Sequence, residues 1–121
     1  MSGSTPQLIA NVVRRFQEEV PALAKLKLVF ALELRGRGDV QIFRVELPGP
    51  KVSKAVADDA RVTVSMPRSH FNELAEDGRV SHYRDAYEQG HIRVEGDNNV
   101  QKLIAQVIER HEQRGRLRKV Q

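Results

Sequence analysis

Four histidines are the residues of this chain best suited to metal binding or acid–base chemistry. His70, His82, His91 and His111 fall in separate segments, without the short, regular spacings that hold metal ligands together. Isolated histidines of this kind are mostly ordinary surface residues that titrate near neutral pH. We therefore expect no metal site among them.

His82 and Asp85 lie one helical turn apart and could form a local pair. Acid–base catalysis by such a pair also needs a nucleophile within reach, and none stands near it in the sequence. Ser65 and Ser69 lie outside the nucleophile-elbow pattern. The chain has no cysteine, which excludes disulfides, thiolate metal sites and thiol nucleophiles. The sequence therefore predicts a protein with no enzymatic activity and no cofactor.

The segment Gly36-Arg-Gly-Asp39 resembles a phosphate-binding loop and also a cell-adhesion tripeptide. A phosphate-binding loop needs a further glycine and a helix directly after it, and neither follows here. Adhesion would need a secreted protein, and no secretory context supports it. The segment is better explained as the turn of a β-hairpin.

The composition is that of one soluble globular domain. The chain has 121 residues, of which 40% are hydrophobic and 30% are charged. Its longest apolar run, Leu28 to Leu32, is far shorter than the roughly 20 residues of a membrane-spanning helix. The N-terminus shows no basic region followed by an apolar core, so no secretion signal is expected. These features predict a cytoplasmic protein.

The net charge of +4 is confined to a basic C-terminal tail, residues 110–121, which holds five Lys or Arg and one Glu. Cations are favoured at a helix C-terminus, so the tail is best interpreted as a solvated helix end. Transient contact with an anionic membrane is the alternative. Nucleic-acid binding is disfavoured, because aromatic residues are only 5% of the chain and fit apolar faces rather than a stacking platform.

Hydrophobic periodicity and turn residues predict a helix, four strands, two short helices, a strand and a final helix. The expected bounds are a helix over 5–20, ended by Pro21; strands at 28–35, 40–47, 52–56 and 61–66; helices at 69–77 and 81–89; a strand at 90–97, followed by an Asp97-capped helix from Val100. The apolar phase changes within 40–47, which predicts a β-bulge near Ile42. This order indicates an α+β fold.

Residues 59–108 resemble the sterol carrier protein type 2 family of lipid-binding domains. The resemblance rests on the turn and strand Asp59-Ala-Arg-Val-Thr-Val-Ser65, on short helices stopped by Gly78 and Gly90, and on Gly90-His-Ile-Arg-Val-Glu-Gly96-Asp97 before the last helix. The resemblance implies a mixed five-stranded sheet in the order 3-2-1-4-5, covered on one face by helices, with an apolar tunnel between. It also implies a non-enzymatic carrier of a fatty acyl, phospholipid, quinone or sterol-like ligand.

The same resemblance implies that inward-facing side chains of the strands and helices line the tunnel. They are Leu32, Leu34, Phe43, Val45, Phe71, Leu74, Tyr83, Tyr87, Ile92, Val94, Leu103, Ile104 and Val107. Periodicity alone does not separate a lined tunnel from a filled core. An accessory interaction module of the same fold, with a filled cavity and a partner enzyme, therefore stays as the alternative.

Two departures from the family pattern narrow these expectations. The chain has no tryptophan and few aromatic residues, which disfavours a bulky sterol ligand. It ends Arg118-Lys-Val-Gln121 rather than in a peroxisomal tripeptide. A short, arginine-rich chain of this style suggests a bacterial protein, for which fatty acids, phospholipids or quinones are the better ligands.

Overall fold

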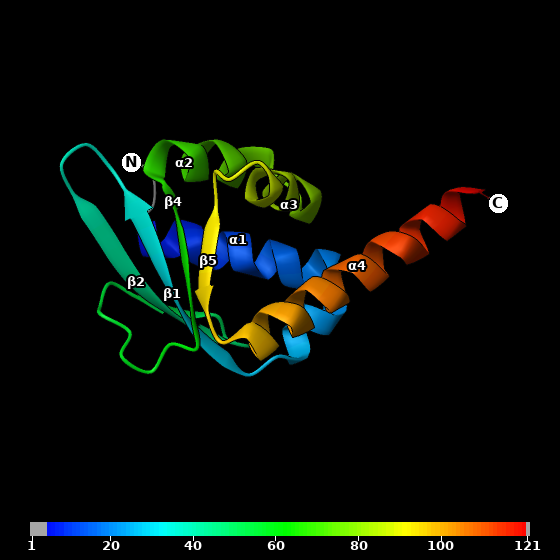
Figure 1. Cartoon of the computed structure of the whole chain (residues 1–121), viewed down its shortest axis with the longest axis horizontal. Helices are drawn as coiled ribbons and strands as arrows, with labels where there is room; N and C mark the ends of the chain where they lie inside the picture. The colour runs from blue at the N-terminus through cyan, green and yellow to red at the C-terminus, as the bar shows by residue number, and fades with distance from the viewer. Residues whose placement is uncertain (1–4, 121) are drawn as a thin grey trace.

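The computed structural model describes residues 5–120, with all of their side chains except those of 77 and 115–120. The elements follow the predicted order, with one added 3₁₀ helix (Figure 1). They are α1 (Thr5–Glu19), η1 (Pro21–Lys25), β1 (Leu28–Arg35), β2 (Val40–Leu47), β3 (Lys51–Ser53), β4 (Val62–Pro67), α2 (Arg68–Asp77), α3 (Val80–Glu88), β5 (Arg93–Gly96) and α4 (Asn98–Val120).

The five strands form one mixed sheet in the order β3-β2-β1-β4-β5, which confirms the predicted order. β1 lies at the centre, antiparallel to β2 and parallel to β4. β3 and β5 form the two edges, each antiparallel to its neighbour. The Gly36–Asp39 segment closes the β1–β2 hairpin through a hydrogen bond from the Gly36 amide to the Asp39 carbonyl at 2.9 Å, as expected for a turn.

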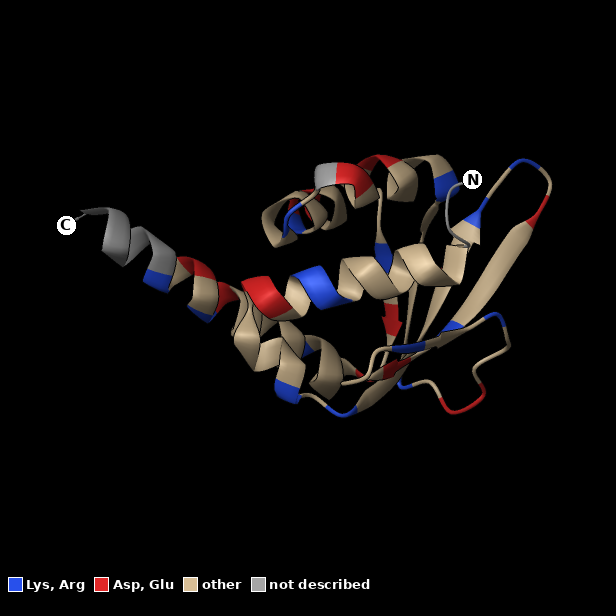
Figure 2. Ribbon diagram, turned by 180° about the vertical axis from the view of Figure 1, so that it is seen from behind, with Lys and Arg blue, Asp and Glu red and all other residues tan. Residues whose placement is uncertain are grey.

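The two faces of the sheet differ in polarity because successive side chains of a strand point to opposite sides. On the inner face Leu34, Phe43 and Val45 are fully buried. The helices cover this face, and Figure 2 shows α1 lying across the strands. On the outer face Arg44 pairs with Asp59 at 2.6 Å. The arrangement confirms an α+β fold with helices on one face.

The register between β1 and β2 is unbroken over the full length of both strands, from Leu28 opposite Leu47 to Arg35 opposite Val40. The predicted bulge near Ile42 is therefore wrong. The apolar phase changes because Val40 lies at the hairpin end, where its side chain is 53% exposed. Ile42 is half-buried on the outer face of the sheet.

The chain after α1 contains an element that periodicity did not predict. α1 ends at Glu19, just before Pro21 as expected. Pro21 then begins the 3₁₀ helix η1, because its fixed backbone angle suits a first helical turn. The Leu23 amide donates to the Val20 carbonyl at 2.9 Å, and the chain enters β1 three residues after η1 ends.

α4 is a long helix that continues into the basic C-terminal tail as far as Val120. Figure 1 shows its C-terminal part projecting away from the rest of the molecule. Arg110 and Arg114 are exposed, and the tail side chains from 115 onward lie outside the described residues. None of the helices in the described part of the chain has the length and apolar character needed to cross a bilayer.

Asp97 caps α4, as predicted. Its Oδ1 accepts hydrogen bonds from the Asn99 amide at 2.9 Å and the Val100 amide at 3.3 Å. Its Oδ2 pairs with the Arg61 guanidinium from the start of β4. The Arg61 hydrogen bond, followed by these amide bonds, lowers the pKa of Asp97 below its ordinary value. The carboxylate therefore links the start of α4 to the residue that precedes β4.

The Asp97→Asn variant is expected to unfold at a lower temperature than the wild type at neutral pH. Asparagine still caps a helix, but it carries no charge to pair with Arg61. A carboxyl with a lowered folded-state pKa stabilises the fold above its unfolded-state pKa of about 4 and loses this effect as the pH falls through its folded-state value. Thermal unfolding as a function of pH should therefore show the two proteins converging in acid.

Asp97→Ala serves as the control because it removes the cap as well as the charge. It should be the least stable of the three proteins at neutral pH. A difference between wild type and Asp97→Asn that is as large in acid as at neutral pH would contradict this account of the ion pair.

Candidate functional site

A cavity of about 640 Å³ lies between the inner face of the sheet and the helices. Its volume is within the range of about 300–1,000 Å³ that is common for small-molecule sites. Apolar side chains of four strands form its floor. They are Leu28, Phe30, Leu32, Leu47, Val62, Val64, Met66 and Val94.

The helices complete the walls of this cavity. α1, η1 with its following residue, and α3 supply apolar and aromatic side chains that face the floor. They are Ile9, Val12, Val13, Phe16, Leu23, Leu26, Val80, Tyr83 and Tyr87. The remaining wall is a stripe of α4 with spacings of three and four residues, which places its members on one helix face. This stripe is Gln101, Ile104, Ala105, Ile108, Glu109 and Glu112.

Tyr83 is a half-buried aromatic residue of the cavity wall that carries a polar group. Its ring meets Phe16 edge-on, with the ring centroids 4.6 Å apart and the planes at 81°. Its hydroxyl is buried and has no hydrogen-bond partner among the described residues. Burial raises the pKa of Tyr83 to about 12, and nearby Arg15 opposes this shift. The cavity therefore contains a neutral donor with no protein acceptor.

The Tyr83→Phe variant is expected to be about 1 kcal/mol more stable than the wild type when both are free of ligand. Removing a buried hydroxyl that lacks a partner removes its desolvation penalty, while the ring keeps its contact with Phe16. Chemical denaturation of the two ligand-free proteins measures the difference. A loss of stability would show that the hydroxyl is hydrogen-bonded in the folded protein.

Charged residues gather where α3 faces α4 at the rim of the cavity. Arg84 of α3 forms an ion pair with Glu112 of α4, and its Nε lies 3.2 Å from Glu88 of its own helix. Glu112 holds the pKa of Arg84 above its ordinary value. The Glu88 side chain is largely exposed, whereas Glu112 is mostly covered. The ion pair links the two helices across the rim.

A model of the SCP-2 sterol transfer family matches residues 9–109. The chain belongs to this family. The match covers the whole sheet, η1, α2 and α3, together with α1 from Ile9 onward and α4 as far as Glu109. It therefore includes all the cavity-lining residues except Glu112 and Gln113. A search by sequence finds no significant match among curated proteins.

Solved structures of SCP-2 proteins share the fold. Palmitated SCP2L2 of Aedes aegypti is 25% identical, with a TM-score of 0.58 over 83% of this chain and 93% of that one. The crystal structure of Sterol Carrier Protein 2 Like 2 from the same organism is 23% identical, with a TM-score of 0.58 over 86% and 99%. Sterol Carrier Protein-2 of Aedes aegypti, in complex with palmitate, is 19% identical, with a TM-score of 0.57 over 86% and 93%.

Some residues expected from the sequence to line an SCP-2 tunnel do lie around the cavity. They are Leu32, Phe71, Tyr83, Tyr87, Ile92, Val94 and Ile104. Leu34, Phe43 and Val45 are at most 1% exposed and lie in the solid core instead. They do so because α2 packs directly on β1 and α1 lies against β3, which leaves no space at that end of the sheet. Contact of any of these residues with a ligand stays a prediction.

The other expected lining residues lie outside the cavity. Leu103 is 46% exposed, and Val107 is not among the cavity-lining residues. Successive residues of a helix lie about 100° apart around its axis. The residues that follow Leu103 and Val107, which are Ile104 and Ile108, are the ones that face the cavity. Leu74 lines a different, smaller pocket.

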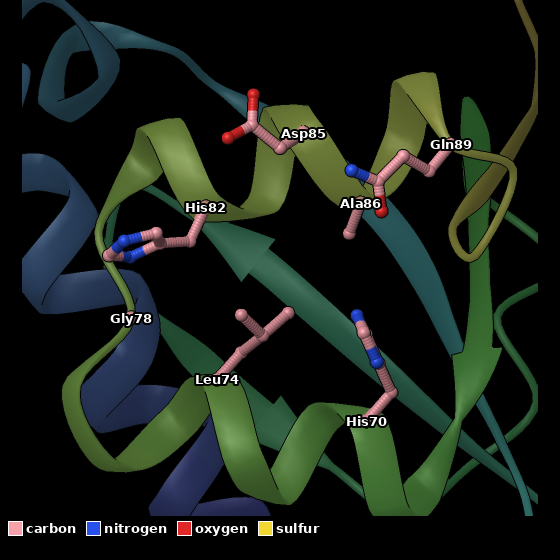
Figure 3. Close-up of a pocket in the computed structure, with 7 residues that line it drawn as sticks. All are labelled: His70, Leu74, Gly78, His82, Asp85, Ala86 and Gln89. Atoms are coloured by element: carbon pink, nitrogen blue, oxygen red, sulfur yellow. The ribbon is translucent and has the colours of Figure 1, made fainter.

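This second pocket, of about 360 Å³, lies between α2 and α3 (Figure 3). His70 and Leu74 of α2 face Ala86 of α3, and the carboxylate of Asp85 points away from Leu74. His82 Nδ1 accepts a hydrogen bond from the Arg79 amide at 2.9 Å, so this ring caps α3. No hydrogen bond joins His82 to Asp85 among the described side chains. The pocket is wide open to solvent and mixed in polarity, and the larger apolar cavity is the stronger candidate site.

The fold also brings together two histidines that are far apart in the sequence. The rings of His70 and His91 lie 5.0 Å apart between their centroids. Within the described part of the chain, no group of three or more His, Asp or Glu residues is placed to hold a metal ion. The histidine pair is therefore a packing contact between α2 and the segment before β5.

Sequence reasoning missed the α1 and η1 contributions and the charged rim of the cavity. The apolar face of α1 was visible as periodicity, and its position over the sheet made it a cavity wall. Leu23 and Leu26 were visible only as isolated apolar residues between prolines and lysines. The pairing of Arg84 with Glu112 joins positions 28 residues apart, and no local pattern indicates it.

Proposed function

We propose that this protein is a non-enzymatic lipid-binding or lipid-transfer protein that encloses the apolar chain of its ligand in the 640 Å³ cavity. The observation that carries the proposal is a cavity whose floor and walls are almost entirely apolar, in a chain of the SCP-2 family. Fatty acyl, phospholipid, quinone and sterol-like ligands all present such a chain or ring system. The palmitate bound to related proteins of this fold supports an acyl-sized ligand.

The physical driving force is the burial of apolar surface. Covering about 300 Å² of ligand at about 25 cal/mol per Å² gives a gross gain of about 7 kcal/mol. Association costs then reduce this gain, so binding is reversible and of roughly micromolar strength. That strength suits a carrier, which must release its ligand as well as hold it.

Native mass spectrometry of the protein purified from cells tests the proposal. The protein should carry a noncovalent mass that disappears on denaturation and is identified as lipid in the solvent extract. Protein that is always empty, and that gains no lipid when incubated with vesicles, would overturn lipid carriage. An empty protein that co-purifies with an enzyme would instead identify an accessory module.

The proposal extends to membrane contact through the basic C-terminal tail, residues 110–121. A helix with exposed cations attracts anionic headgroups, at about 1 kcal/mol per Lys or Arg near the surface. Deleting residues 114–121 is expected to leave the far-ultraviolet spectrum intact and to weaken sedimentation with phosphatidylserine-containing vesicles. Unchanged sedimentation at low salt would reject a membrane role for the tail.

A further inference from the structure

Acidic side chains outnumber basic ones among the residues that line the cavity. Among the described residues that line it, Arg84 is the one cation, whereas there are three carboxylates, Glu88, Glu109 and Glu112. The other walls are apolar or carry neutral amides. The basic residues that give the chain its positive net charge lie mostly in the tail and do not line the cavity. A ligand headgroup at the rim therefore meets an acidic surface.

The single lining cation is already engaged. Arg84 is paired with both Glu112 and Glu88. A lipid carboxylate would have to compete with these two carboxylates for Arg84. Displacing the mostly covered Glu112 would leave that carboxylate without its counter-charge. Arg15, the other cation that acts on the wall at Tyr83, is not among the lining residues.

The cavity nevertheless offers a buried neutral hydrogen-bond donor that has no partner among the described residues. The Tyr83 hydroxyl is buried without a protein partner, and the edge-on contact with Phe16 fixes the position of its ring. Gln17 and Gln101 each donate from Nε2 to a backbone carbonyl, of Pro48 at 2.7 Å and Gly96 at 3.2 Å. A ligand oxygen is the acceptor that the Tyr83 hydroxyl lacks.

We infer that the cavity selects an uncharged lipid with an oxygen acceptor, such as a long-chain alcohol, an ester or a quinone-type carbonyl, over a lipid carboxylate. The inference rests on the proposed lipid carriage and specifies its ligand class. The rim carboxylates Glu88, Glu109 and Glu112 repel an anionic headgroup, and the Tyr83 hydroxyl donates to a neutral oxygen. Two related proteins hold palmitate, a lipid carboxylate, whereas this cavity is expected to favour a neutral headgroup.

Isothermal titration calorimetry of the delipidated full-length protein tests this with two ligands of one chain length, dodecanol and dodecanoate. At neutral pH dodecanol should bind about tenfold more tightly than dodecanoate. Glu109→Gln should strengthen dodecanoate binding several-fold and change dodecanol binding by much less, since Glu109 has no ion-pair partner among the described residues. The matched control is Glu73→Gln, on the exposed surface of α2, which should change neither affinity.

The Tyr83→Phe variant tests the hydrogen bond. It should weaken dodecanol binding about three- to tenfold, which corresponds to one lost hydrogen bond. Dodecanoate that binds as tightly as dodecanol to the wild type would overturn the inference and leave lipid carriage standing. An unchanged dodecanol affinity of Tyr83→Phe would overturn the role of the hydroxyl. Binding of neither ligand would overturn the proposed function together with the inference.

Discussion

The Ile104→Trp variant is expected to bind lipid more than about tenfold more weakly than the wild type. Ile104 is half-buried on the stripe of α4 that lines the cavity. A tryptophan side chain there fills space that the apolar chain of the ligand would occupy, and the cavity has room for it without forcing the helix off the sheet. Calorimetric titration with whichever of dodecanol and dodecanoate binds the wild type more tightly measures the loss.

Leu103→Trp provides the matched control, since Leu103 is the preceding residue of the same helix, is 46% exposed and does not line the cavity. It should keep lipid affinity within about twofold of the wild type. Both variants should keep the unfolding transition of the parent protein. Equal losses of affinity in the two variants would contradict the assignment of this face of α4 to the cavity wall.

The Gly96→Ala variant is expected to lose about 3 kcal/mol of unfolding free energy, the largest loss we predict for a single methyl group. Gly96 ends β5 with a φ of +123°, a backbone conformation that L side chains rarely adopt. A Cβ at this position would lie 2.5 Å from the Arg61 carbonyl oxygen and 2.9 Å from Val62 Cα. Both atoms belong to the backbone of the neighbouring strand and cannot move without breaking the β4–β5 pairing.

Gly38→Ala separates the cost of the backbone angle from the cost of the close approach. Gly38 also has a positive φ, +74°, but a Cβ there meets nothing within 4 Å. The expected loss is about 1 kcal/mol, the usual cost of a left-handed conformation for alanine. Urea unfolding measures both variants. Similar losses at the two positions would show that contact with β4 adds nothing at Gly96.

The order of the elements was predictable because local chemistry marks each boundary. The signals are short-range. They are the alternation of apolar and polar residues in 28–35 and 90–97, the Asp97 cap and the glycines after the two short helices. The bulge was predicted wrongly because periodicity reports a change of phase and not its cause. At Val40 the cause is simple exposure at the end of a hairpin.

The candidate site was less predictable than the fold, because it depends on where helices rest on the sheet. Phe43 and Val94 both point to the inner face of the sheet, yet Phe43 is buried in the core and Val94 lines the cavity. The difference arises because α1 and α2 pack directly on the strands at one end of the sheet. α4, in contrast, extends away from the other end of the sheet after β5. Periodicity alone did not show which residues of α4 face the cavity, because its apolar residues occur as the adjacent pairs 103–104 and 107–108.

The central claim is that the apolar chain of a lipid occupies the cavity between the sheet and α4. Methyl-labelled NMR spectra, recorded with a dodecyl ligand carrying a spin label at its chain end, test it most directly. The methyl signals of Val64, Ile104 and Ile108, which line the cavity, should broaden, and those of the exposed Val40 and Val56 should not. Broadening at Val40 and Val56, with sharp signals from the cavity methyls, would contradict the account.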